Sequence, residues 1–366
     1  MHNKISVLAA TAALAFGAAA AHAEGVSIKG AVDLGLTLTH AHHGKTKFSM
    51  TPDNYVGSEF GLFGEELLDG GNRVGFALRS RFNPDTGAFQ TAGGLFDYES
   101  QIYLKGDWGQ LGAGRMSPFT ASTGSQGWMM DFDAFEAGYQ DAGLQATQQT
   151  TWAAYDNALY YVTPSVSGLK AGVFYSLQGD TRNDGSEKRQ SANNRYWNVA
   201  LRYDGEKLSA LLAAEGEIRA SGTTLKDGQV YRAAVRCDFG PFKLLGGYSR
   251  AEHQNKYAYA AFEENFYDTT GLSEGLSSDQ AWLGVRIPAG QIEYVAQYQF
   301  LRGRNKDKDE RFKRHVLAAG GYYYLSRRTI LYANVSKSIG SGALSVSQGA
   351  RDTNYIAMQA GVTHFF

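Results

Sequence analysis

The strongest constraint on the fold is an alternation of apolar with polar or small residues that recurs along most of the chain. In GQIEYVAQYQF, residues 290–300, Tyr294 and its even-numbered neighbours fall on one face of an extended strand, and Glu293 and its odd-numbered neighbours fall on the other. This period of two is typical of β-strands with one apolar and one polar face. Residues 195–205 and 229–240 alternate in the same way.

About sixteen such segments can be counted, and the connections between them alternate in length. Short connections carry turn residues, as in LLDGGN and PSVSG, whereas the connection over residues 117–156 is far longer than an ordinary loop. Short turns at one end and long loops at the other are typical of an outer-membrane β-barrel. We therefore expect an all-β antiparallel barrel with strands that start near residues 25, 54, 72, 96, 109, 157, 168, 195, 207, 228, 241, 279, 290, 311, 329 and 354.

The N-terminus favours export. Lys4, an apolar stretch over residues 5–20 and the sequence Ala21-His22-Ala23 form a signal peptide, so we expect cleavage after Ala23 and a single barrel domain over residues 24–366. No later apolar run approaches the roughly 18 residues that a membrane helix needs. A chain that crosses a bilayer without such helices must close its strands into a barrel, because open sheet edges cannot be satisfied in lipid.

The last strand supports closure. In GVTHFF, residues 361–366, Val362, His364 and Phe366 share one face. In a stack of two sheets an aromatic terminus would be left uncovered, whereas in a barrel it pairs with the first strand and its outer face meets lipid. The lone cysteine, Cys237, excludes a disulfide framework and is expected to fill space on the lipid face.

Several stretches resemble the Gram-negative general porins, in particular the trimeric 16-stranded type found in β-proteobacteria. Residues 57–89 resemble the second and third strands of that family and the start of its second loop. Residues 96–119 resemble its fourth and fifth strands, residues 157–176 the pair after the third loop, and GVTHFF the C-terminal strand. Together with VSIKGAVDLGL near the N-terminus, the likeness covers most of the chain apart from the long loops.

The resemblance implies a water-filled channel in the outer membrane for passive diffusion of small hydrophilic solutes and ions, narrowed by the third loop. It also implies a homotrimer whose second loop reaches a neighbour, contact with the bilayer and lipopolysaccharide, and no catalysis or cofactor. Val362, His364 and Phe366 would form the signal that the barrel-assembly machinery reads.

The residues expected to carry the function are charges across a narrow aqueous gap. From Met116 to Leu169 the chain has no lysine or arginine, so the third loop would supply an acidic side through Asp131, Asp133, Glu136 and Asp141. Strand parity turns three arginines of residues 73–82 into the lumen, and a fourth stands at the bend before the loop; the expected basic wall is Arg73, Arg79, Arg81 and Arg115. The alternatives are that the loop acids are simply solvated or that Glu99 pairs with these arginines.

Other side chains face the lumen by parity: Glu59, Glu99, Lys105, Arg202, Arg232 and Arg236. Glu59 and Phe63 stand where the family usually carries bases, which favours a weak preference for cations over anions.

Three functions from other classes remain open: a substrate-specific channel for a sugar or organic acid, a barrel enzyme, and a secreted adhesin. No serine–histidine signature supports the enzyme. His40, His42 and His43 cluster in the first long loop, but no neighbouring carboxylate or cysteine completes a metal site, and we expect none. The 35 basic and 36 acidic residues give no basic excess, so nucleic acid is not an expected partner.

Overall fold

The computed structural model describes residues 25–42, 46–136, 142–147, 149, 154–177, 193–255, 271–343 and 353–366. The expected signal peptide, His43 and Asp141 lie outside these ranges. Strands dominate the described part of the chain, together with the short 3-10 helices η1 (Asp69–Gly71), η2 (Met129–Phe132) and η3 (Leu144–Thr147). In these ranges, helices with the length and apolarity of a membrane span are absent.

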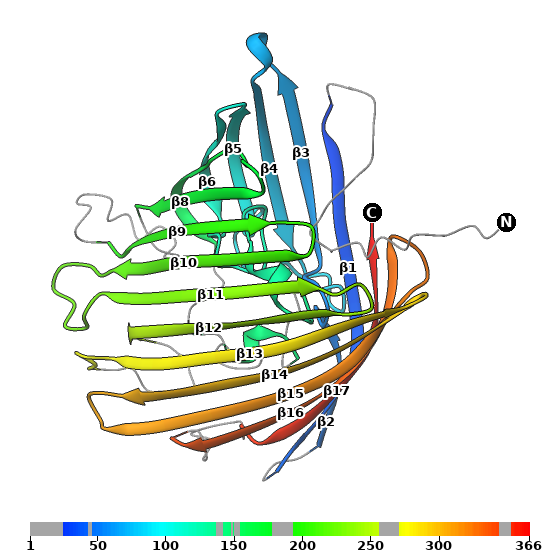
Figure 1. Cartoon of the computed structure of the whole chain (residues 1–366), viewed down its shortest axis with the longest axis vertical. Coiled ribbons are helices and arrows are strands. Elements are labelled where there is room, and N and C mark those ends of the chain that lie inside the picture. The colour runs from blue at the N-terminus through cyan, green and yellow to red at the C-terminus, as the bar shows by residue number, and fades with distance from the viewer. Residues whose placement is uncertain are drawn as a thin grey trace.

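All the strands belong to one antiparallel sheet that curls around a central space (Figure 1). In chain order they are β1 (Ser27–Ala41), β2 (Thr46–Pro52), β3 (Glu59–Leu67), β4 (Arg73–Arg81), β5 (Glu99–Gly106), β6 (Gly109–Met116), β7 (Tyr155–Val162), β8 (Leu169–Ser176), β9 (Arg195–Asp204), β10 (Leu208–Ile218), β11 (Gly228–Asp238), β12 (Lys243–Gln254), β13 (Leu276–Ala289), β14 (Ile292–Asn305), β15 (Glu310–Tyr324), β16 (Thr329–Gly342) and β17 (Tyr355–Phe365).

The sheet closes on itself. From β3 onward each strand pairs with the next, and β17 pairs with β1, with Ala31 opposite Phe365. One half of β1 pairs with β3 and the other half with β2, so β2 and β3 together fill one position of the ring. The ring therefore has sixteen positions, and the predicted 16-stranded barrel is confirmed.

Strand β2 lies between the expected strand starts near residues 25 and 54, in the region assigned from the sequence to the first long loop, and that assignment was wrong. The segment continues the alternation, with Phe48 and Met50 exposed on the outer face at 66% and 56%. The strand ends at Pro52, and the next residues turn into the lumen. Asp33 holds this turn, because its carboxylate accepts the backbone N–H groups of Asn54 and Tyr55 at 2.9 and 3.3 Å.

The faces of the wall follow the predicted parity. On β14, Glu293 and Gln297 are buried toward the lumen, whereas Tyr294 and Tyr298 are 52% and 42% exposed on the outside. Polar side chains inside and apolar side chains outside are the reverse of a soluble protein. This arrangement is expected for a sheet whose outer face meets hydrocarbon and whose inner face meets water.

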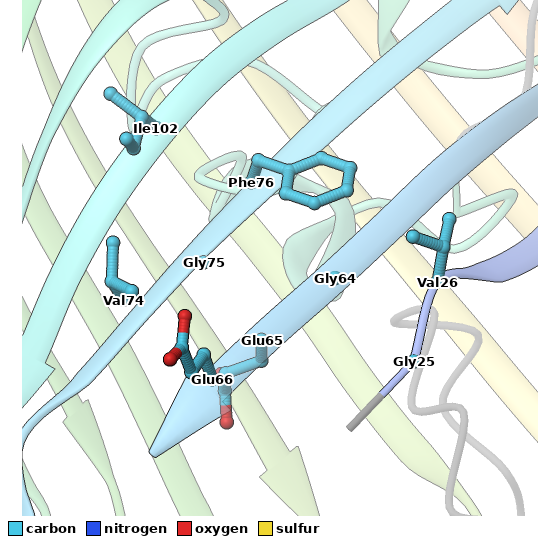
Figure 2. A pocket seen from close by; sticks show the side chains of 9 residues that line it. All are labelled: Gly25, Val26, Gly64, Glu65, Glu66, Val74, Gly75, Phe76 and Ile102. Carbon is cyan, nitrogen blue, oxygen red and sulfur yellow. The ribbon is translucent and has the colours of Figure 1, made fainter. Parts of the chain in front are cut away.

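The wall is uneven in height. Strands β4 to β8 have 8 or 9 residues, whereas β13 to β16 have 14 or 15. We call β4 to β8 the low wall and β13 to β16 the high wall. Residues of β3 and of the low-wall strands β4 and β5 line a shallow depression that also involves Gly25 and Val26 (Figure 2).

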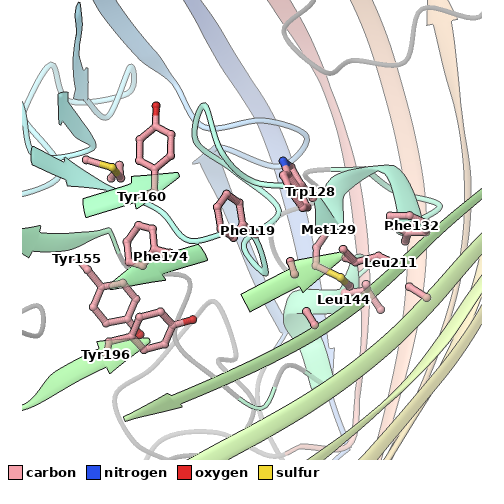
Figure 3. Packing of buried hydrophobic residues seen from close by; sticks show 14 of the residues in the cluster. Phe119, Trp128, Met129, Phe132, Leu144, Tyr155, Tyr160, Phe174, Tyr196 and Leu211 are labelled. Atoms are coloured by element: carbon pink, nitrogen blue, oxygen red, sulfur yellow. The ribbon is translucent and has the colours of Figure 1, made fainter. Parts of the chain in front are cut away.

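The segment between β6 and β7 fills part of the lumen, and we call its described residues 117–136, 142–147, 149 and 154 the inner loop. Its apolar side chains pack with inward-facing residues of the wall (Figure 3). Phe119 and Phe132 are fully buried, with Leu211 of β10 and Trp282 of β13 in the same apolar cluster. This burial gives a physical reason for a connection of such length.

Candidate functional site

The position of the inner loop is set by contacts along much of the ring. The rings of Phe119 and Trp128 lie 4.5 Å apart, and Phe119 also meets Phe174 of β8 edge-on at 6.3 Å. Farther along, the indole N–H of Trp282 donates to the Phe132 carbonyl at 2.8 Å. Aromatic packing and a buried hydrogen bond therefore fix the loop against the wall.

Glutamines of the wall satisfy the backbone of the inner loop. The Gln297 side-chain carbonyl accepts the N–H of Ala134 at 2.9 Å, and Gln299 donates to the carbonyls of Ala142 and Gly143 at 3.0 and 2.9 Å. A buried loop needs such partners because its own backbone groups are not paired in a sheet. This role was not predicted from the sequence, although the pair of inward glutamines in VAQYQF is its signal.

Arg79 of β4 is held between two carboxylates of neighbouring strands. It pairs with Glu59 of β3 and, at 2.7 Å, with Glu99 of β5. The three side chains are nearly inaccessible, at 3%, 10% and 0% exposure. The pairing of Glu99 with a wall arginine, an alternative considered from the sequence, is thus observed. This cluster has one more carboxylate than guanidinium groups.

Arg286 of β13 forms a second cluster of the same composition, which the sequence analysis missed. It pairs with Glu136 of the inner loop and through two nitrogens with Glu293 of β14. The Tyr55 hydroxyl, from the turn between β2 and β3, donates to Glu136 at 2.7 Å. The loop carboxylate is therefore fixed from two sides of the lumen.

Asp131 belongs to a third cluster, with an excess of bases. It pairs with Arg202 of β9 and, at 3.4 Å, with Arg236 of β11. Arg202 also pairs with Asp204 at 2.8 Å, and Lys170 of β8 lies 3.7 Å from Asp204. Three bases of the wall formed by β8 to β11 thus face two carboxylates, one on β9 and one on the inner loop.

Asp133 is held by hydrogen bonds. Its carboxylate accepts the N–H groups of Leu144 and Phe135 at 2.7 and 3.1 Å and the Gln297 amide at 2.9 Å. Complete burial raises its pKa to about 7, although these hydrogen bonds and the charge of Arg286 act to lower it.

The remaining predicted residues have partners close to their own strands. Arg73 and Lys105 share Glu65, the first at 2.9 Å. Arg232 pairs with Glu215 at 3.1 Å, and the guanidinium of Arg81 lies 3.9 Å from the ring centre of Tyr98. Arg115 sits at the bend and pairs with Asp156 at 2.7 Å. Within the described residues, no ion pair joins an acid of the inner loop to Arg73, Arg79, Arg81 or Arg115.

The C-terminal residues lie on the outer face of β17. Val362 and Phe366 are 40% and 39% exposed, and the His364 ring bonds the hydroxyl of Thr329 at 2.9 Å. Phe366 exchanges two backbone hydrogen bonds with Gly30, at 3.2 and 3.0 Å. At the first loop, His40 bonds Thr46 at 2.9 Å, and the described ranges contain no group of three potential metal ligands.

Comparison with known proteins agrees with this architecture. A profile described as Gram-negative porin matches residues 10–342. An outer membrane porin protein of Bordetella pertussis is 26% identical over 99% of this chain and 100% of its own length, and outer membrane porin protein 32 of Delftia acidovorans is 25% identical over 98% and 99%.

Two solved structures share the fold. An anion-selective porin from Comamonas acidovorans has a TM-score of 0.71 at 23% identity and covers 93% of this chain and 99% of its own. A trimer form of OmpT, an outer membrane protein of Vibrio cholerae, has a TM-score of 0.63 at 12% identity, with coverage of 93% and 99%. With a family profile that spans most of its length, this chain belongs to the Gram-negative porins, channel-forming barrels of the outer membrane.

Proposed function

We propose that the porin's lumen is a general diffusion path for small hydrophilic solutes with a weak preference for cations. The supporting observation is the composition of the buried clusters. The Arg79 cluster and the Arg286 cluster each contain two carboxylates and one guanidinium. An excess of fixed negative charge raises the local concentration of cations in a narrow aqueous space.

In the proposed constriction, the bases that face the loop acids are not the ones that the sequence-based hypothesis named. The inner-loop acids Asp131 and Glu136 face Arg202, Arg236 and Arg286. The local basic excess lies at β8 to β11, and the acidic excess lies at the other two clusters. We propose that the transverse field runs between these regions, with Asp141 as a further loop acid outside the described residues.

The test is a planar-bilayer measurement of reversal potential in a KCl gradient. The proposal expects a potential of the sign that marks K⁺ permeation over Cl⁻, and a flux of neutral sugars that rises linearly with concentration. A preference for Cl⁻ would refute the selectivity, and saturable block by one solute would favour a substrate-specific channel.

The Arg79→Gln variant sharpens this test. Removal of the guanidinium leaves Glu59 and Glu99 unbalanced, so the reversal potential should shift toward cation permeation. The matched control is Arg327→Gln, because Arg327 is exposed at the turn between β15 and β16. If both variants shift the potential equally, the buried cluster does not set the selectivity.

We also propose a homotrimer in which the low wall faces the neighbouring subunits. A transmembrane strand needs about 9–11 residues, and the strands of the low wall have 8 or 9. Such a short wall suits burial between subunits better than contact with lipid. The second loop, residues 83–95, would reach the neighbour, and cross-linking of purified protein would reveal the number of subunits.

The outer-face residues Val362, His364 and Phe366 would be read by the barrel-assembly machinery, and residues 1–23 would direct export. No reaction is assigned to the channel.

A further inference from the structure

The segment between β2 and β3, residues 53–58, is a second insertion into the lumen, and we call it the inward turn. Pro52 ends β2 opposite Leu34 of β1. Glu59 begins β3 opposite Ala31 of the same strand. Six residues thus stand where β1 offers only two partners. Residues without a partner in the ladder must leave the sheet.

Hydrogen bonds to Asp33 of β1 fix the inward turn in place. The Ser58 hydroxyl accepts the Asp33 N–H at 3.0 Å and donates to the Asp33 carbonyl at 3.1 Å. The hydroxyl of Tyr332, from β16, donates to the Asp33 carboxylate at 3.0 Å. Within the turn, the Asp53 carboxylate accepts the Ser58 N–H at 2.6 Å. Because Asp33 and Ser58 are fully buried, these bonds are shielded from water and keep the turn in one conformation.

Tyr55 connects the inward turn to the inner loop. The residue is 2% exposed, and its ring lies 4.7 Å from the ring of Tyr322 and 6.1 Å from that of Tyr332. Its hydroxyl donates to one carboxylate oxygen of Glu136 at 2.7 Å, and Arg286 pairs with the other oxygen. Glu136 has a φ of 55°, in the left-handed region that a glutamate adopts only when its surroundings hold it there. Tyr55 and Arg286 together hold this strained residue.

The tip of the inward turn is the part that reaches water. Tyr55 and Ser58 are buried, whereas Val56 and Gly57 between them are partly exposed. Val56 also packs against the apolar cluster that contains Tyr55 and Phe135, so it lies inside the lumen at the level of the inner loop. An exposed side chain at that position faces the aqueous part of the lumen.

We propose that the inward turn forms a second side of the constriction, in which Tyr55 positions Glu136 and Val56 lines the conduction path. What a channel passes depends on the side chains at its narrowest part. The tip of the turn therefore limits solute size, and its buried tyrosine keeps a loop acid in place. The inference rests on the channel function of the porin family and not on the proposed ion selectivity. A reversal potential that refuted the selectivity would leave the inference standing.

The first experiment places a cysteine at Val56 in a Cys237→Ser background and exposes the porin, inserted in a planar bilayer, to a charged methanethiosulfonate reagent. The single-channel conductance should fall, because the reagent adds a charged group inside the path. Val316→Cys is the matched control, since Val316 also points inward but is fully buried, and its conductance should not change. Mass spectrometry reports whether each thiol has reacted.

An unreactive Val56→Cys, or a reacted one with unchanged conductance, would overturn the lining role. Gly57→Cys provides the same test if Val56→Cys folds poorly.

The second experiment counts brief closures in single-channel records of Tyr55→Phe, which loses the hydroxyl and keeps the ring. Loss of one hydrogen bond to a charged group should raise the closure frequency roughly tenfold or more. Tyr103→Phe is the control, because its hydroxyl bonds Glu65 of β3 at 3.2 Å, outside the inner loop. This control should behave as the wild type does.

In a Glu136→Ala background, Tyr55→Phe should have no further effect, because Tyr55 acts through that carboxylate. Two outcomes would overturn the positioning role. One is equal closure frequencies in Tyr55→Phe and Tyr103→Phe. The other is an undiminished effect of Tyr55→Phe in the Glu136→Ala background.

Discussion

At the scale of single residues, the position of the inner loop depends on the groups that pair with its carboxylates. Asp131 and Glu136 use guanidinium groups of the wall, whereas Asp133 uses backbone and amide donors. Breaking a buried ion pair by removing one partner costs about 3–5 kcal/mol. Arg286 pairs with both Glu136 and Glu293. Its substitution should therefore destabilise the docked inner loop as well as change the local charge.

Asp133 should make loop docking depend on pH. Its pKa rises from 3.8 to about 7 in the docked loop, so between these values the docked loop binds a proton that an undocked loop has released. Docking should therefore be most stable at low pH and weaken as the pH rises through this window. In single-channel records, brief current fluctuations should be more frequent at pH 8 than at pH 5.

The Asp133→Asn variant cannot titrate at this position, so its fluctuations should not change between the two pH values. Asp131→Asn is the matched control, because it removes another carboxylate from the same loop and leaves Asp133 in place. A pH response that persists in Asp133→Asn would show that another group is responsible.

At the scale of elements, the inner loop needs space on the wall, and small residues provide it. Gly172 of β8 faces the lumen, and a Cβ atom there would lie 2.5 Å from the ring of Phe119. That ring is fully buried against Trp128 and Phe174, so it cannot move without disturbing the start of the loop.

The Gly172→Ala substitution should therefore loosen the loop by about 1–3 kcal/mol, the usual cost of overpacking. The barrel should still form, because the backbone pairing of β8 with β9 is unaffected. Limited proteolysis within residues 117–136 should become faster than in the wild type. Gly240→Ala is not a suitable control because of its positive φ, but Gly321→Ala is, since the nearest atom there is at 3.4 Å. Equal proteolysis of the two variants would contradict the steric argument.

At the scale of the whole molecule, the outer face predicts where the bilayer lies. Leu283 occupies the middle of the high wall and Ser341 lies beside Lys313 at the loop end. Arginine at the bilayer midplane costs about 2–4 kcal/mol, whereas near the interface it costs about 0–1. Leu283→Arg should thus make folding into phospholipid vesicles less favourable, and by far more than Ser341→Arg does. Similar losses in urea titrations would mean that the hydrocarbon level is misplaced.

The barrel and the approximate starts of its strands could be predicted from the sequence alone, and residues of the clearly alternating strands could be assigned to one face or the other. The physical reason is that a residue's face depends only on the two-residue period of its own strand. Arg79, Glu59 and Glu99 could therefore be assigned to the lumen without coordinates. Strand β2 was not predicted because the sequence of its short hairpin with β1 is equally compatible with a loop.

Which charges form ion pairs could be seen only in the folded barrel. Arg286 became part of the site because the inner loop brings Glu136 to it, across 150 residues of sequence. The loop path follows from apolar packing of Phe119, Phe132 and Trp282 inside the ring, and no local period in the sequence encodes that path. Parity places a charge on a face, but the charge's partner depends on where a distant segment finds burial and hydrogen bonds.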